Sequence, residues 1–195
     1  MTKTIKYYNK NASDFIMSTQ EVEFHEIQIK FAGKLSKGSR ILDFGCGSGR
    51  DTKYFLSQGY QVDAIDGSEE ICRLASAYTG IPVRHMLFQE LSAENMYDGI
   101  WACSSILHLL YDELRDVLIR MSHALKEKGI AYTSFKYGTF EGERNGRYFI
   151  DMTEEKMERL LRETSVFHIE EQWVSKDVRP GRENEKWLNI ILRKN

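Results

Sequence analysis

Short apolar runs alternate with amphipathic segments along the chain from Arg40 onward. The apolar runs read RILDF, QVDAI, VRHMLF, GIWAC and IAYTSF, and each has the length and composition of a buried strand. Segments of helical length separate them. Strands that alternate with helices pair in parallel through right-handed crossovers. The pattern predicts an α/β fold with one doubly wound, Rossmann-like sheet and helices on both faces.

Capping signals indicate where the intervening helices begin and end. Ser68 and Thr153 are expected to be the N-caps of the helices that follow them. A third helix is expected to begin at Asp112 and to end at Gly129, because an apolar stripe at helical spacing runs through this segment and includes Leu125. The run VRHMLF is expected to be a strand over its whole length.

Segments at both ends extend this core. Residues 1–38 precede the repeat, and Phe24, Ile27 and Phe31 form an apolar helical face in EVEFHEIQIKFAGKL, which predicts an N-terminal helical extension. The start YYNKNASDF can close over the cofactor, or it can simply cover the sheet. The β-rich runs VFHIEEQWV and KWLNIILR flank a polar loop that contains Pro180, which predicts a terminal hairpin. We therefore expect a single domain over 1–195, with the cofactor-binding α/β core at 39–195.

Charge and cysteine content argue against several classes of protein. A net charge of −2 is unfavourable for a protein that holds nucleic acid through a basic surface. No window reaches the ~18 uninterrupted apolar residues of a membrane span, and the first residues lack the apolar core of a signal peptide. We expect a cytoplasmic protein with no membrane partner. Cys46, Cys72 and Cys103 form no C-x-x-C motif and the histidines lack metal-ligand spacing, so we expect reduced thiols and no metal.

The stretch ILDFGCGSGRD places three alternating glycines directly after the first apolar run. In the dinucleotide fingerprint G-x-G-x-x-G the third glycine comes one residue later, which disfavours an NAD-dependent dehydrogenase. Asp43 and Asp51 flank the loop and suit a cofactor that is cationic there, such as S-adenosylmethionine (SAM). Asp66 ends the second run, where a carboxylate can accept hydrogen bonds from ribose hydroxyls in either cofactor. The alternative is an ordinary tight turn in which Asp66 caps a strand.

ILDFGCGSGRD followed by VDAIDGSEE resembles the first two motifs of the class I SAM-dependent methyltransferases, with a likeness over 40–135. The resemblance implies a mostly parallel, seven-stranded sheet with a reversed last strand. It also implies SAM as cofactor and S-adenosylhomocysteine (SAH) as product. The cofactor-binding residues that we expect are Tyr8, Asp43, Gly45, Cys46, Gly47, Arg50, Asp51, Asp66, Gly67, Ser68, Gln89, Glu90, Leu91 and Cys103.

The resemblance also divides these residues among the parts of the cofactor. The backbone of residues 45–47 contacts the methionine part, Asp66 contacts the ribose, and the adenine packs near residues 67–68. In the segment FQEL, either Gln89 or Glu90 approaches the adenine amine, and both remain open.

GSGRDTKYFLSQGYQVDAIDGSEE and SFKYGTFEGERNGRYF further resemble the small tellurite-resistance-type methyltransferases, which implies an oxyanion such as tellurite or selenite as acceptor. Arginine forks suit oxyanions, and two loops, 136–147 and 176–186, carry arginines that can close over the site. The catalytic residues that we expect are His108, Arg144, Arg147 and Arg179. The alternative is local pairing of these arginines with acids of the same loops, namely Glu141, Glu143, Asp177, Glu183 and Glu185.

His108 has two interpretations of equal weight. It can deprotonate a thiol or hydroxyl, or position an anion, and it can instead be a partly buried histidine that packs a helix. Cys103 is expected to be a small packing residue beside the cofactor.

The function that these observations favour is methyl transfer from SAM to a small-molecule acceptor. The more specific prediction is that this acceptor is an anion. Methylation of RNA or protein is an alternative, disfavoured by the low net charge. A sensor or partner subunit that binds SAM without catalysis is another. We expect a monomer or a homodimer.

Overall fold

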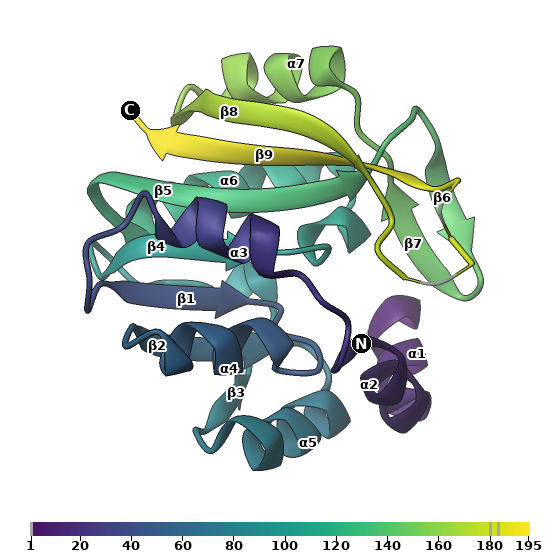
Figure 1. Cartoon of the computed structure of the whole chain (residues 1–195). Coiled ribbons are helices and arrows are strands. Elements are labelled where there is room, and N and C mark those ends of the chain that lie inside the picture. The colour runs from purple at the N-terminus through teal and green to yellow at the C-terminus, as the bar shows by residue number, and fades with distance from the viewer. Residues whose placement is uncertain (1, 180, 183) are drawn as a thin grey trace.

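The computed structural model describes residues 2–179, 181–182 and 184–195. Within them a seven-stranded sheet has the order β3-β2-β1-β4-β5-β9-β8 (Figure 1). Its strands are β1 (Arg40–Phe44), β2 (Gln61–Asp66), β3 (Val83–His85), β4 (Tyr97–Ala102), β5 (Leu125–Lys136), β8 (Phe167–Lys176) and β9 (Lys186–Lys194). The first five strands pair in parallel, and β9 is antiparallel to β5 and β8. The predicted doubly wound sheet with a reversed last strand is confirmed.

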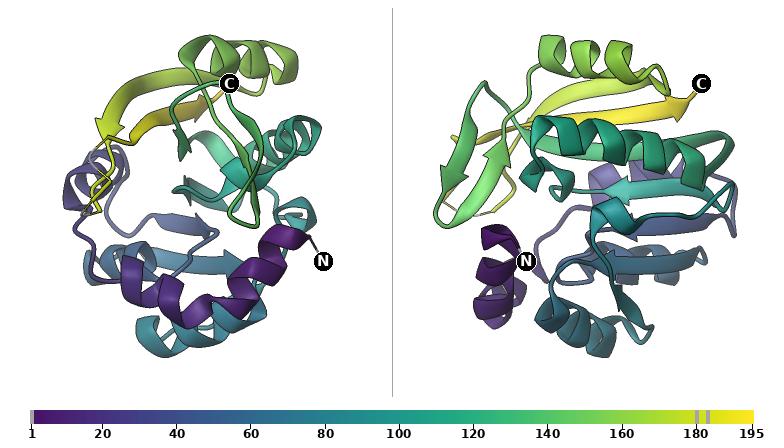
Figure 2. Two further views of the ribbon diagram at one scale, coloured as in Figure 1. Left: turned by 90° about the vertical axis from the view of Figure 1, so that its right-hand side faces the viewer. Right: turned by 180° about the vertical axis from the view of Figure 1, so that it is seen from behind.

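Helices cover both faces of the sheet (Figures 1 and 2). One face carries α3 (His25–Ala32), α4 (Arg50–Ser57) and α5 (Glu69–Thr79), and the other carries α6 (Tyr111–Ala124) and α7 (Glu154–Thr164). On the first face, Phe31 and Phe55 pack around Trp101, with ring centroids 5.1 and 5.2 Å from that of the indole. On the second face, Leu114 and Leu118 of α6 are fully buried in the larger of the apolar cores. The site is therefore built on a packed sheet.

The predicted N-caps are confirmed. The Ser68 hydroxyl accepts a hydrogen bond from the Ile71 N–H at 3.3 Å, and the Thr153 hydroxyl accepts one from the Lys156 N–H at 3.2 Å. Each hydroxyl satisfies a backbone donor that the first helical turn leaves without a partner.

The helix predicted to run to Gly129 is shorter than expected. α6 ends at Ala124, because Leu125 is extended, fully buried and paired with Tyr97 at the start of β4. A buried leucine fits the apolar face of a helix and a buried strand equally well, so the apolar spacing continued past the end of the helix and predicted it too long. Gly129 lies inside β5 rather than at a helix end.

The run VRHMLF is also only partly a strand. β3 is an edge strand that pairs with the last three residues of β2 and ends at His85. The chain then forms a 3-10 turn, η1 (Phe88–Glu90), in which the Glu90 carboxylate accepts a hydrogen bond from the Leu87 N–H at 2.7 Å.

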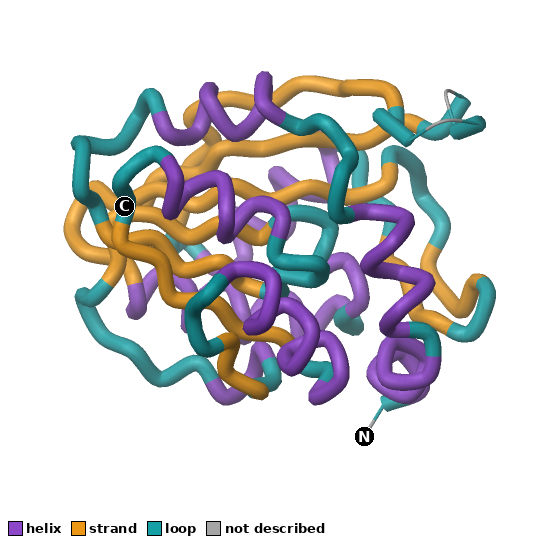
Figure 3. The backbone as a smooth tube through the Cα atoms, turned by 60° about the horizontal axis from the view of Figure 1, so that its bottom comes forward, coloured by secondary structure: helices purple, strands orange, loops and turns teal. Residues whose placement is uncertain are grey.

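A helix pair and a two-stranded hairpin lie beyond the carboxyl ends of the strands of the main sheet (Figures 1 and 2). The N-terminal cover consists of α1 (Lys3–Lys10) and α2 (Ala12–Thr19), and the hairpin consists of β6 (Glu141–Arg144) and β7 (Arg147–Ile150). The apolar helical face expected in EVEFHEIQIKFAGKL belongs to α3, and α1 and α2 precede it along the chain (Figure 3). None of the described helices is long and apolar enough to cross a membrane.

The hairpin corrects the expectation of a plain polar loop over 136–147. Asn145 and Gly146 connect its strands with φ angles of 49° and 77°. Two successive residues with positive φ are the signature of a type I′ turn, for which Asn-Gly is the preferred pair. The sequence therefore contained this signal within ERNGR.

Candidate functional site

The carboxyl ends of β1, β2, β4 and β5 open into a cavity of about 570 Å³. Its walls come from the loop after β1, the turn after β2, the segment after β4, the N-terminal cover, the hairpin and the connection between β8 and β9. In a doubly wound sheet, ligands bind at this edge, where the winding reverses. Of the residues predicted for the site, those that line the cavity are Tyr8, Gly45, Cys46, Gly47, Arg50, Asp51, Asp66, Gly67, Ser68, Gln89, Cys103, His108, Arg147 and Arg179.

The glycine loop is folded tightly against the neighbouring strands. The N–H groups of Gly45 and Cys46 both donate to the Ile65 carbonyl, at 3.0 and 2.9 Å. Gly45 has a φ of 89°, and a Cβ there would lie 2.5 Å from the Cβ of Ser105. Only glycine fits such a position. The loop backbone thus comes close to the cavity with no side chain in between.

Asp66 connects this loop to the start of α5. One carboxylate oxygen accepts from the Gly47 N–H at 3.1 Å and the other from the Ser68 N–H at 2.9 Å. Burial raises the pKa of Asp66, and these backbone donors oppose the shift. The carboxylate is therefore fixed in orientation at the cavity wall, with lone pairs left for a ligand.

Asp51 lies at the opposite side of the loop in a dense polar network. Its carboxylate accepts hydrogen bonds from Gln28 at 2.6 Å, from Trp101 at 2.8 Å and from both ends of the Arg50 guanidinium at 2.8 and 2.9 Å. Burial alone would raise the pKa of Asp51, but Arg50 and these donors hold it below its ordinary value. The Arg50 guanidinium also lies 4.5 Å from the centre of the Phe24 ring. The cavity therefore meets an ion pair here rather than a bare acid.

Three residues predicted to bind the cofactor do not line the cavity. The Asp43 carboxylate is buried beneath α4 and accepts from the Thr52 hydroxyl at 2.5 Å, and burial raises its pKa. Glu90 caps its own turn, and Leu91 is buried in the core. Of the two candidates near an adenine amine, only Gln89 lines the cavity.

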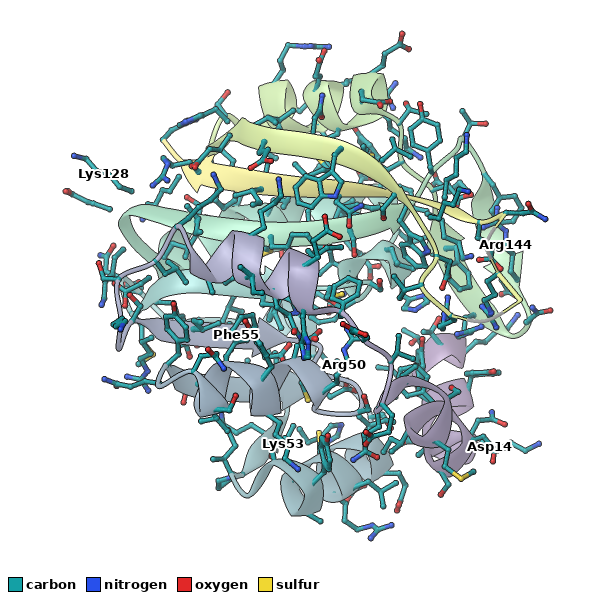
Figure 4. All side chains as sticks on the ribbon, in the orientation of Figure 1. Asp14, Arg50, Lys53, Phe55, Lys128 and Arg144 are labelled. Atoms are coloured by element: carbon teal, nitrogen blue, oxygen red, sulfur yellow. The ribbon has the colours of Figure 1, made fainter. Side chains whose placement is uncertain are left out.

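The three predicted arginines have different surroundings. Arg144 forms two hydrogen bonds to Asp151, at 2.9 and 2.7 Å, and does not line the cavity. Figure 4 shows it on the hairpin, well away from Arg50 at the start of α4. Arg179 lines the cavity but forms a bidentate pair with Asp177. Local pairing, the alternative to an anion-binding lid, thus occupies both. Pro180 and Glu183 of the second loop lie outside the described residues.

Arg147 belongs to a chain of hydrogen bonds that crosses the cavity wall. Its guanidinium donates to the Tyr8 hydroxyl at 3.3 Å, and that hydroxyl lies 3.0 Å from Nε2 of His108. Nδ1 of His108 is 2.6 Å from the Tyr148 carbonyl. A carbonyl can only accept, so Nδ1 carries the proton. Burial lowers the pKa of His108 to about 4, so the ring is neutral, and its Nε2 accepts a hydrogen bond from the Tyr8 hydroxyl.

Several residues that line the cavity, or that bond to a lining residue, were not among the predicted site residues. Phe15 of α2 lies against the glycine loop, 3.2 Å from where a Cβ of Gly47 would be. Trp187 of β9 lines the cavity and donates to Asp177 at 3.0 Å. Gln28 reaches Asp51 from α3. No local pattern marks these residues, because their positions depend on how separate elements pack.

The sequence is similar to those of known methyltransferases. Residues 41–129 match the family model described as methyltransferase domain. An uncharacterized methyltransferase of Staphylococcus carnosus is 23% identical over 154 residues, 73% of this chain and 74% of that protein. The ubiquinone biosynthesis O-methyltransferase of Rickettsia conorii is 28% identical over 119 residues, 58% of this chain but only 39% of the longer relative.

One solved structure is similar over nearly the whole chain. The 1,6-didemethyltoxoflavin-N1-methyltransferase of Burkholderia thailandensis, with bound 1,6-didemethyltoxoflavin and SAH, has a TM-score of 0.79 and 23% identity. The match covers 98% of this chain and 87% of that one. The likeness establishes a common fold that includes the seven-stranded sheet.

Proposed function

Because the chain is a class I SAM-dependent methyltransferase, we propose that it transfers the methyl group of SAM to a small-molecule acceptor held in the cavity. The observation that carries the proposal is the division of the cavity into two parts. One part is formed by the glycine loop and Asp66, and the other by the end of β4, the hairpin and the N-terminal cover.

Asp66 and the glycine loop are proposed to hold the cofactor. The fixed Asp66 carboxylate suits two ribose hydroxyls, and Gly67, Ser68 and Gln89 lie beside it for the adenine. The backbone of Gly45–Gly47 suits the methionine part. SAM supplies an activated methyl group, so the main task of the protein is to hold a nucleophile in line with it.

The covered cavity favours a small acceptor over RNA or protein. Tyr8 of the cover bonds to His108, and the Thr4 hydroxyl accepts from the Tyr148 N–H of β7 at 3.1 Å, so the cover and the hairpin meet above the cavity. The relatives from Rickettsia and Burkholderia carry the names of small-molecule methyltransferases. A small acceptor is the matching proposal for this chain.

A finer proposal is that the acceptor carries an anionic group, of which a tellurite- or selenite-type oxyanion is one member. Arg147 supports it, because its guanidinium lines the cavity and has no carboxylate within 4.0 Å among the described residues. Arg144 and Arg179 support it less, because each already binds a carboxylate.

The test combines cofactor binding with methyl transfer. SAM and SAH should bind to the purified protein in calorimetry. Labelled SAM is then supplied with tellurite or selenite and a thiol reductant, and volatile label is measured. Enzyme-dependent volatile label supports the oxyanion acceptor. SAM binding without it removes the oxyanion and leaves organic acceptors. Absence of SAM binding overturns the proposed function, and binding without transfer to any acceptor favours the sensor alternative.

A further inference from the structure

The directions of the hydrogen bonds around Tyr8 restrict what the acceptor can be. We infer that the methyl acceptor is an organic anion that also carries a hydrogen-bond donor, such as a hydroxyl, amino or thiol group, and that Arg147 binds the anionic group while Tyr8 accepts from the donor. The inference rests on the proposed function, since it names the substrate class of the same cavity.

Tyr8 is an acceptor toward the cavity. The Tyr148 carbonyl fixes the proton of His108 on Nδ1, so Nε2 is an acceptor and the Tyr8 hydroxyl donates its only hydrogen bond to it. A phenol oxygen then has two lone pairs, one of which accepts from Arg147. The remaining lone pair can accept from a ligand but cannot donate to one. His108 is thus a positioning residue that sets the polarity of Tyr8.

Arg147 carries a positive charge that the described residues leave without a carboxylate. Four other cations of the cavity wall each have one within 4.0 Å, namely Arg50 with Asp51, Lys136 with Glu185, Arg179 with Asp177 and Arg182 with Glu185. Lys176 has none among the described residues, but its side chain is exposed to solvent, whereas Arg147 is half-buried. The Nε atom of Arg147 is buried and has no hydrogen-bond partner among the described residues. A half-buried guanidinium with unused donors is unfavourable unless a ligand supplies an acceptor. A carboxylate or similar anion does so.

The two groups are close enough to bind one molecule. The Arg147 guanidinium and the Tyr8 oxygen are 3.3 Å apart, so ligand atoms that contact them are separated by few bonds. Aromatic rings enclose the guanidinium, with centroids at 4.6 Å for Tyr7, 5.6 Å for Tyr8 and 5.2 Å for Phe149. Such walls favour an apolar organic body over a small inorganic ion.

The experiment measures the binding of three probes to SAH-saturated protein. 3-Hydroxybenzoate has both groups, benzoate has only the carboxylate, and phenol has only the hydroxyl. We expect 3-hydroxybenzoate to bind about fivefold more tightly than benzoate and at least about tenfold more tightly than phenol. Equal affinities, or binding of no probe by protein that binds SAH, would overturn the inference while leaving the proposed function standing. Methylation of tellurite with no probe binding would overturn it as well.

Variants assign each preference to its residue. Tyr8→Phe should abolish the preference for 3-hydroxybenzoate over benzoate, and Arg147→Met the preference over phenol. His108→Phe frees the Tyr8 proton to donate to a ligand, so 3-methoxybenzoate, whose ether oxygen can only accept, should bind more tightly to this variant than to the parent protein, which a merely structural role of His108 would not cause. Arg162→Met, at an exposed arginine of α7, is the matched control and should change no affinity. Retention of the hydroxyl preference in Tyr8→Phe that still binds SAH would remove Tyr8 from the contact.

Discussion

Two aspartates near the ends of adjacent strands, Asp43 and Asp66, show how environment decides the role of a residue. Asp43 is buried and Asp66 is partly buried, and burial raises the pKa of each. Asp43 is turned under α4 and bonds to Thr52, whereas Asp66 bonds to two backbone N–H groups at the cavity wall. From the sequence, Asp43 suited a cationic cofactor and Asp66 suited the ribose hydroxyls. Only Asp66 has a carboxylate that a ligand can reach.

We predict that Asp66→Ala raises the dissociation constant for SAM by about 5- to 150-fold, or about 1–3 kcal/mol, because buried hydrogen bonds to the ribose are lost. Isothermal titration calorimetry measures the change. Asp43→Asn is the control, since an amide keeps the bond from Thr52 and reproduces the neutral carboxyl that burial favours. Its dissociation constant should stay within about twofold of the parent value. Unchanged binding in Asp66→Ala would remove Asp66 from the site.

His108 should make the stability of the protein depend on pH. Its pKa falls from 6.5 to about 4 on burial. As the pH falls, the unfolded state therefore binds the proton before the folded state does. The free energy of unfolding is highest above pH 6.5 and decreases as the pH falls from 6.5 through about 4. The loss amounts to about 3 kcal/mol. Urea denaturation of the parent and of His108→Gln at pH 4 to 7 measures it, and the variant should show the smaller decline. Parallel declines would mean that His108 titrates normally in the folded state.

At the scale of elements, local sequence signals predicted the strands and the helix caps, and one further signal marks the hairpin. The strands, the helix caps and the reversed last strand followed from apolar runs, Ser68 and Thr153, and the family resemblance. The hairpin was missed although Asn145-Gly146 is a strong turn signal. The antiparallel register pairs Arg144 with Arg147 at the turn, so the Arg144 side chain reaches Asp151 by running back along the hairpin.

We predict that Gly146→Ala destabilises the hairpin by about 1–2 kcal/mol. A Cβ at φ 77° is strained, and it would lie 3.3 Å from the Tyr7 ring. Asn145→Gly is the matched control, because glycine adopts a φ of 49° without strain, and its effect should stay below about 0.5 kcal/mol. Hydrogen exchange of the amides in 141–150 measures both. Faster exchange in the control than in Gly146→Ala would argue against this turn as the feature that holds Arg147.

At the scale of the whole molecule, the two parts of the cavity differ in how they are encoded. The proposed cofactor part lies, apart from Gln89, between the glycine loop and Ser68, so a sequence motif predicts it. The proposed acceptor part joins Tyr8 to His108 and Arg147, which are 100 and 139 residues away along the chain. No sequence spacing predicts such contacts, because they arise only when the N-terminal cover and the hairpin pack over the sheet.

The same arrangement predicts that one ligand stabilises distant segments together. SAH at 100 times its dissociation constant should stabilise the protein by about 2.7 kcal/mol, which raises Tm by about 5–10 °C for a chain of this size. The cover and the glycine loop face one cavity, so amides of α1 and α2 should exchange more slowly with SAH than without it. Asp66→Ala at the same SAH concentration should lose most of both effects. A higher Tm with unchanged exchange in α1 and α2 would mean that the cover packs on the protein alone and takes no part in holding the cofactor.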